Sequence, residues 1–126
     1  LPYEQNTEFE DVDYTKIEKA HKTLSVLVKN SVAIKKEAEF MMYVPYNQLV
    51  SSELTDKVLV QGVVDLIIEY ENDITIVDYK FSKLNANILK QKYKEQLNLY
   101  KLAVEKAYKK PVNKMLIYSI ETGELV

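Results

Sequence analysis

The sequence predicts an α/β fold with a small central mixed sheet, and three observations lead to this class. Apolar residues recur at helical spacing in two stretches, one near the start of the chain and one after residue 87. Val, Ile and Tyr are concentrated in the stretches between them, which favours pleated, partly buried strands. Helical and extended stretches follow in the order α-β-β-β-α-β, which is typical of an α/β sandwich.

The first half of the chain divides by local patterns. Asp13 is a suitable N-cap, and the apolar residues after it predict a first helix over residues 14–30. Residues 31–45 have the composition of a strand, and 46–56 that of a loop. Two further strands are predicted on either side of a tight turn. They cover residues 58–70 and 74–81.

The second half begins with a polar connection over residues 82–87. A long helix is predicted over 88–109, with a buried stripe at helical spacing, and Pro111 ends it. A last strand over 115–120 precedes a turn at Thr122-Gly123.

Length and composition limit the class of protein. The 126 residues suffice for one domain with a modest core, so we expect a single domain with its core at about 14–121, after a loosely held lead-in at 1–11. No apolar run approaches the roughly 18 residues of a membrane span. No signal peptide is visible, and the missing initiator Met indicates a piece of a longer protein. The absence of cysteine excludes disulfides and Cys-ligated metal sites, and it fits a cytoplasmic protein.

The charge pattern bears on nucleic-acid binding. All 17 basic residues are lysine, so the chain can bind phosphate through point charges but offers no bidentate guanidinium. The net charge of −2 gives no global attraction for a polyanion. Binding of DNA would therefore need a local patch or neighbouring domains.

Two aspartates and a lysine lie on the predicted hairpin. If Asn72-Asp73 forms a two-residue loop, Asp65 lies opposite Lys80 and Asp78 lies opposite Ile67. Side chains alternate along a strand, so Asp65, Asp78 and Lys80 would share one face. Two carboxylates and a lysine in this arrangement can hold a divalent cation and activate water against a phosphodiester.

Other interpretations of these three residues stay open. They could be solvated surface charge or a structural Asp–Lys pair, although the apolar residues around both aspartates argue for buried strands. A carboxylate pair could also serve glycoside hydrolysis. Lys80 favours phosphate chemistry, because it can stabilise negative charge on a transferring phosphoryl group.

A second set of polar residues lies on the long predicted helix. Tyr93, Gln96 and Tyr100 share one face, where tyrosines at helical spacing are usually core residues. The Gln96 amide needs hydrogen-bond partners there, which a DNA phosphate or an active-site water could supply. Glu37, on the first strand, could add a third carboxylate or a link to Lys80, or it could be an exposed strand-end charge.

Other catalytic systems find little support. The two glycines, Gly62 and Gly123, cannot form a phosphate-cradling loop or a dinucleotide fingerprint. One histidine and no cysteine leave no credible Ser/His/Asp or Cys/His nucleophile system.

The motifs, in their order along the chain, resemble those of the RecB-type branch of the PD-(D/E)XK nucleases. The resemblance extends from about Ile17 to Tyr118, and the run G-x-x-D, D-Y-K and Q-L-x-L-Y is specific, whereas each motif alone is weak. The matching stretches are Lys36-Glu37-Ala38-Glu39-Phe40, Gly62-Val63-Val64-Asp65-Leu66-Ile67, Val77-Asp78-Tyr79-Lys80 and Tyr93-Lys94-Glu95-Gln96-Leu97-Asn98-Leu99-Tyr100.

This resemblance implies a restriction-endonuclease-like core and a role for each matched residue. Asp65 and Asp78 would ligate Mg²⁺, or Mn²⁺ in its place, with the backbone carbonyl of Tyr79 beside them. Lys80 would orient the attacking water or help to deprotonate it. Glu37 matches the supporting carboxylate of E-x-x-F. The Q-x-x-x-Y pair, which contacts the site or the DNA strand, is matched by Gln96 and Tyr100.

The resemblance further implies magnesium-dependent cleavage of DNA during the repair and recombination of double-strand breaks. The expected partners are helicase domains of the same parent chain and a second helicase–nuclease subunit. No membrane is expected. Two alternatives remain. One is a stand-alone RecB-like exonuclease, and the other is a catalytically weak nuclease-fold module that binds DNA or a partner subunit.

Two departures from the family pattern stand out. The family usually has a further metal-binding histidine on a helix well before E-x-x-F, whereas His21 lies only 16 positions before Glu37. We expect the true histidine upstream of this chain, so that the isolated domain binds metal weakly and cleaves poorly. Asp78-Tyr79-Lys80 is followed by Phe81 where Thr is frequent.

Overall fold

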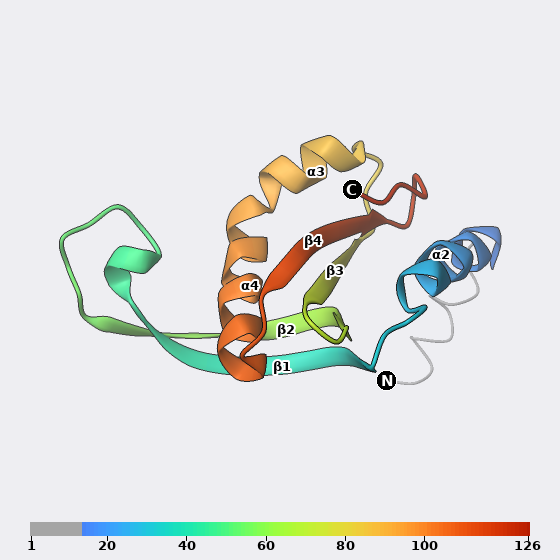
Figure 1. The fold of residues 1–126 in the computed structure, drawn as a ribbon. Coiled ribbons are helices and arrows are strands. Elements are labelled where there is room, and N and C mark those ends of the chain that lie inside the picture. The colour runs from blue at the N-terminus through green and yellow to red at the C-terminus, as the bar shows by residue number, and fades with distance from the viewer. Residues whose placement is uncertain (1–13) are drawn as a thin grey trace, which may run out of the picture.

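The computed structural model describes residues 14–126, which form both helices and strands (Figure 1). In chain order they are α2 (Tyr14–Leu27), β1 (Ala33–Pro45), the short 3₁₀ helix η1 (Tyr46–Gln48), β2 (Lys57–Glu69), β3 (Ile74–Lys80), α3 (Ala86–Lys92), α4 (Lys94–Tyr108) and β4 (Val112–Ser119).

The four strands form one mixed sheet in the order β1-β2-β3-β4. The β1–β2 and β2–β3 pairs are antiparallel, and β4 runs parallel to β3 after the crossover through α3 and α4. The α3–α4 segment lies on one face of the sheet, and β1 and β2 extend together beyond it toward the loop that connects them (Figure 1). The predicted α/β class with a mixed sheet is confirmed.

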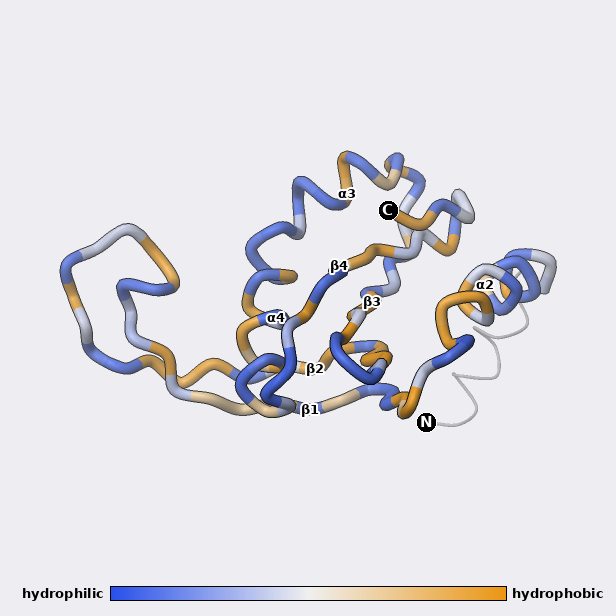
Figure 2. The backbone as a smooth tube through the Cα atoms, in the orientation of Figure 1, coloured by the Kyte–Doolittle hydropathy of each residue, from blue (hydrophilic) through white to orange (hydrophobic). Residues whose placement is uncertain are grey.

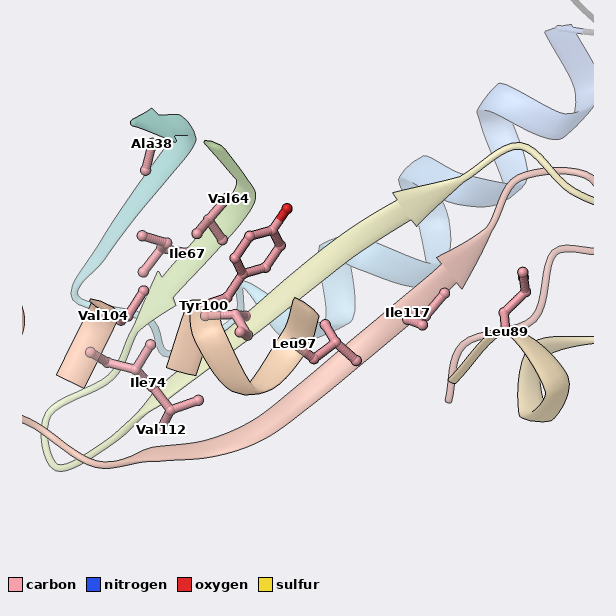
Figure 3. Close-up of a cluster of buried hydrophobic side chains, with 11 residues drawn as sticks. Ala38, Val64, Ile67, Ile74, Leu89, Leu97, Tyr100, Val104, Val112 and Ile117 are labelled. Carbon is pink, nitrogen blue, oxygen red and sulfur yellow. The ribbon is translucent and has the colours of Figure 1, made fainter. Parts of the chain in front are cut away.

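Each face of the sheet has its own core. On the face covered by α2, Ala20 joins a buried cluster with Leu66, Ile68, Val77 and Tyr118. The larger cluster lies under α4 (Figure 3). It comprises Ala38, Val64, Ile67, Ile74, Ile76, Leu89, Leu97, Tyr100, Val104, Val112 and Ile117.

The hydropathy of the elements follows this packing (Figure 2). Hydrophobic residues prevail along the part of β2 that adjoins β3, where residues on both faces of the sheet are buried. Hydrophilic residues prevail along α3 and the start of α4, which have one face in solvent. No helix in the described part of the chain combines the length and the apolar character needed to cross a membrane.

The helix predicted over residues 88–109 is in fact two helices. The first, α3, begins two residues earlier than predicted, because the Asn85 side chain caps it by accepting a hydrogen bond from the Ile88 amide (2.9 Å). Tyr93 separates α3 from α4 with φ −104° and ψ 15°. Local apolar spacing does not reveal such a joint, because the buried stripe continues through it.

Smaller differences occur at the ends of other elements. Helix α2 ends at Leu27, three residues before the predicted end, and its predicted N-cap Asp13 lies outside the described residues. Strand β4 begins at Val112, three residues before the predicted start, because it pairs with β3 from Ile74 onward.

The predicted hairpin register between β2 and β3 is wrong. The Tyr70 amide donates to the Asp73 carbonyl (2.8 Å), so the turn consists of Glu71 and Asn72 rather than Asn72-Asp73. Neither turn residue has a positive φ, which removes the basis of the Asn72-Asp73 prediction.

The corrected register changes the partners on β2 and β3 but keeps their faces. Leu66 pairs with Val77, and continuing this register places Asp65 opposite Asp78 rather than opposite Lys80. Relative to the prediction, one strand is displaced by two residues. Because side chains alternate with a period of two, such a displacement returns each side chain to its original face.

Candidate active site

Strand β3 directs Asp78 and Lys80 to the face covered by α4. They continue the alternation of Ile74 and Ile76, which belong to the core on that face. Asp78 is buried at 4% exposure. The Lys80 side chain is 19% exposed, and its Nζ lies 3.0 Å from Asp78 Oδ2. The two charges therefore form an ion pair at the edge of the core.

Asp65 is tied to the same place from the neighbouring strand. Its Oδ2 accepts a hydrogen bond from the Tyr79 backbone amide (2.8 Å). The backbone ladder between β2 and β3 ends at the pair Leu66–Val77, so this bond connects the strands just beyond the ladder. The two aspartates thus meet at the corrected register, as the shared face predicts.

The ionised form of the Asp78 carboxyl is disfavoured in this buried position. Burial raises its pKa to about 6, the Asp65 carboxylate beside it adds to the rise, and Lys80 opposes it. Among the described residues, Asp78 Oδ2 is one of two buried side-chain oxygens without a hydrogen-bond partner, and the other is the Tyr118 hydroxyl. Lys80 Nζ lies 3.0 Å from Asp78 Oδ2 and offsets its charge. A buried carboxylate beside a half-buried one suits a hard divalent cation, which prefers oxygen ligands.

Helix α4 and the joint before it bring three residues that were predicted for the site close to Lys80 and the two aspartates. Gln96 Oε1 accepts a hydrogen bond from Lys80 Nζ (3.2 Å). The centroid of the Tyr93 ring lies 3.8 Å from the same Nζ. Tyr100 is buried, and the charges of Asp78 and Asp65 both raise the pKa of its hydroxyl. The face predicted for Tyr93, Gln96 and Tyr100 therefore turns toward Lys80 and the two aspartates.

The Tyr100 phenol stays neutral at any ordinary pH. Burial, followed by the Asp78 and Asp65 carboxylates, raises its pKa to about 12. Its hydroxyl lies at the edge of the aliphatic cluster (Figure 3). Its ring meets the Phe40 ring edge to face, with centroids 5.8 Å apart at 78°. A neutral phenol beside two carboxylates can donate a hydrogen bond.

Gly62 supports this aromatic pair. A Cβ at position 62 would lie 3.1 Å from Cε1 and Cζ of Phe40 and 3.8 Å from Cε1 of Tyr100. Glycine therefore lets the Phe40 ring lie directly on the backbone of β2. This contact gives a structural reason for the glycine of G-x-x-D and the phenylalanine of E-x-x-F.

Glu37 occupies an unusual position on β1. It lies between the pairs Lys36–Leu66 and Ala38–Val64, which places it across from Asp65, and its φ is +49°. Its side chain is exposed, and in the described part of the chain no three acidic or histidine residues cluster as a metal site. The structure therefore does not gather Glu37 with the two aspartates.

His21 lies apart from these residues. Its side chain is exposed on α2, the helix that packs on the other face of the sheet.

Three contacts have no counterpart among the predictions from the sequence. They are the Tyr79 amide bond to Asp65, the Phe40 ring on Gly62 and the Tyr93 ring at Lys80. Helical spacing groups Tyr93 with Gln96, and it is the only signal for the third contact. The Tyr79 amide carries no sequence signal, because every residue except proline has one.

Comparisons with known proteins show the family of this chain. A sequence model described as the PD-(D/E)XK nuclease superfamily matches residues 4–125. An ATP-dependent helicase/nuclease subunit of Ligilactobacillus salivarius (strain UCC118) is 34% identical over 104 residues, which cover 79% of this chain and 8% of that protein. The protein of the same name in Ruminiclostridium cellulolyticum is 35% identical over 104 residues, covering 76% and 8%. The chain thus spans about 8% of the length of these curated relatives.

Proposed function

Because this chain belongs to the PD-(D/E)XK nuclease superfamily, we propose that it hydrolyses DNA phosphodiester bonds with the help of Mg²⁺. One observation carries the proposal above all others. Asp65, Asp78 and Lys80 come together in the structure, with Asp65 bonded to the Tyr79 amide beside Asp78 and Lys80 Nζ 3.0 Å from the buried Asp78 Oδ2.

Asp65 and Asp78 would hold the cation, with the Tyr79 carbonyl as a further ligand. Nucleases of this superfamily generally use divalent metal ions, and the two carboxylates suit Mg²⁺ or Mn²⁺. When bound, the ion supplies Lewis acidity and lowers the pKa of coordinated water. The same charge would offset the cost of keeping Asp78 ionised in its buried place.

The remaining residues would act on the water and on the phosphate. Lys80 Nζ, held between Asp78 and Gln96, would orient the attacking water or stabilise negative charge on the phosphoryl oxygens. Gln96 uses its amide oxygen for Lys80, which leaves its NH₂ group to donate to DNA or to water. Tyr100 would donate from a neutral hydroxyl at the edge of the same site.

A local basic stretch supports DNA as the substrate. Residues 79–94 carry five lysines and no acidic residue, although the whole chain has a net charge of −2. The stretch begins at the proposed catalytic Lys80 and continues along α3 to the start of α4. Exposed lysines of this kind bind the phosphate backbone without regard to sequence.

The names of the relatives support a setting for this domain. The matched proteins are named as subunits of an ATP-dependent helicase/nuclease, and this chain corresponds to a small part of each. We therefore propose a single nuclease domain in an AddA-like chain, which also carries helicase domains and pairs with an AddB-like second subunit. Repair and recombination of double-strand breaks in the bacterial cytoplasm is the corresponding role.

Cleavage of labelled single-stranded DNA by the intact protein tests the proposed function. Lys80→Ala should lower the rate at least ~100-fold, the scale on which loss of one preorganised charge acts. Lys106→Ala is the matched control, because Lys106 is an exposed lysine of α4 outside the basic stretch 79–94. Cleavage should require Mg²⁺ or Mn²⁺ and stop with chelator.

The alternative of a binding module predicts a different pattern. The wild-type protein would then bind DNA or a partner subunit but not cleave DNA. The double variant Asp65→Ala/Asp78→Ala would keep the same affinity. Equal cleavage rates for wild type and Lys80→Ala would also contradict the proposed mechanism.

A further inference from the structure

Tyr93 lies at the joint between α3 and α4 with its backbone held on both sides. Its amide donates to the Leu89 carbonyl (2.9 Å), and its carbonyl accepts from the Leu97 amide (3.0 Å). Its ring is partly buried and packs against the core under α4. The position of the ring is therefore set by the fold.

The face of this ring meets the Lys80 ammonium. Nζ lies 3.8 Å from the ring centroid, within the range in which a cation is attracted to an aromatic face. The same Nζ lies 3.0 Å from Asp78 Oδ2 and 3.2 Å from Gln96 Oε1. Two oxygens and one ring thus surround a lysine side chain that is only 19% exposed.

We infer that Tyr93 is a positioning residue, whose ring face holds the Lys80 ammonium in place beside Asp78. This inference rests on the proposed function, in which Lys80 acts on the water or the phosphate. Lysine has a long flexible side chain, so the two oxygen contacts alone leave the ammonium free to change position around them. The Tyr93 ring restricts this motion from a third side.

The attraction comes from the ring and not from its hydroxyl. Cation–π attraction depends on the negative face of the aromatic system, which phenylalanine shares and leucine lacks. If Tyr93 merely fills space, leucine should replace it as well as phenylalanine does. The two substitutions therefore separate positioning from packing.

The test compares Tyr93→Phe and Tyr93→Leu in the intact protein. A lysine with ¹³C at Cε reports the position of Lys80, because a ring face shifts nearby protons upfield, and loss of the signal in Lys80→Gln assigns it. We expect Tyr93→Phe to keep the upfield shift and the rate. Tyr93→Leu should lose the shift and lower kcat at least tenfold, with KM nearly unchanged.

Two controls keep the result independent of folding. A pentafluorinated phenylalanine at position 93 keeps the shape of the ring but reverses its charge distribution, so the rate should fall as with leucine. Lys92→Ala should leave the Lys80 signal unchanged, since the Lys92 ammonium lies farther from the ring centroid, at 5.5 Å.

Failure of this inference differs from failure of the proposed function. Equal shifts and equal rates for the phenylalanine, leucine and pentafluorinated proteins would overturn the positioning role. A wild-type protein that does not cleave DNA, or a Lys80→Ala variant that cleaves as fast, would instead overturn the function. In either of those cases the Lys80 signal still reports whether the ring holds the lysine.

Discussion

The carboxylate of Asp65 accepts the backbone amide of Tyr79 (2.8 Å), and this bond continues the pairing of β2 and β3 past the last rung of the ladder. A side chain thereby takes the place of a backbone carbonyl. The bond fixes Asp65 beside Asp78, at the point where the proposed site begins. Asp65 thus has a structural role as well as the proposed role in binding a cation.

Different substitutions of Asp65 test its two roles separately. Asp65→Asn keeps an acceptor oxygen for the Tyr79 amide but loses the charge, so we expect loss of Mg²⁺ binding with a small change in stability. Asp65→Ala removes the acceptor as well and should lower the free energy of unfolding by about 1–3 kcal/mol. Calorimetric titration with Mg²⁺ and urea unfolding measure the two effects. Equal destabilisation by Asn and Ala would contradict the structural role.

The raised pKa of Asp78 predicts a pH dependence of stability in the presence of a chelator. Its carboxyl titrates near 3.8 when unfolded and at about 6 when folded, so between these values the folded state binds more protons. The contribution of this group to stability is complete below about pH 4 and is lost as the pH rises through about 6. Asp78→Asn removes this loss.

Urea unfolding across this pH range measures the effect. Above about pH 6, Asp78→Asn should be more stable than the wild type by an amount on the order of 2 kcal/mol, and the advantage should vanish near pH 4. Asp56→Asn at an exposed position is the matched control and should show no such trend. A pH-independent difference for Asp78→Asn would refute the prediction.

The Phe40 ring on Gly62 predicts a coupling between the two positions. In Gly62→Ala the new methyl group lies 3.1 Å from the ring, which must move, and overpacking of this kind costs about 1–3 kcal/mol of stability. Phe40→Leu shortens the side chain and should make room for the methyl group. A double-mutant cycle by urea unfolding should therefore give a favourable coupling above about 0.5 kcal/mol. Additive effects would show that the Phe40 ring moves aside with no loss of stability.

The lysines of α3 and α4 should contribute to DNA binding through charge alone. Lys90→Ala/Lys94→Ala removes two exposed positive charges next to the proposed site. It should weaken binding of single-stranded DNA and reduce the slope of log affinity against log salt by up to about 0.7 per lost phosphate contact.

A charge-matched pair on α2 serves as the control. Lys22→Ala/Lys29→Ala makes the same change of net charge at exposed positions on and just after the helix that covers the opposite face of the sheet. Fluorescence anisotropy at several salt concentrations should show little change for this variant. The same loss of affinity in both pairs would show that net charge matters and that the local surface does not.

Much of the fold was predictable because its signals are local. The helical spacing of α2 and α4 and the apolar runs of β2 and β3 each lie within a short stretch. The break at Tyr93 was not predictable, because the apolar stripe runs through it. The predicted hairpin turn is one residue late, since Glu71-Asn72 and Asn72-Asp73 are hard to distinguish by composition.

The sequence by itself determined which side chains share a face, because alternation along a strand holds for any register displaced by two residues. Asp65, Asp78 and Lys80 therefore come together in both the predicted and the observed register. Only the tertiary structure decided their partners, namely the Tyr79 amide, Gln96 and the Tyr93 ring. The burial of Asp78 also depends on how α4 packs on the sheet. Such contacts join residues from separate elements, and their energies depend on distances that no local pattern encodes.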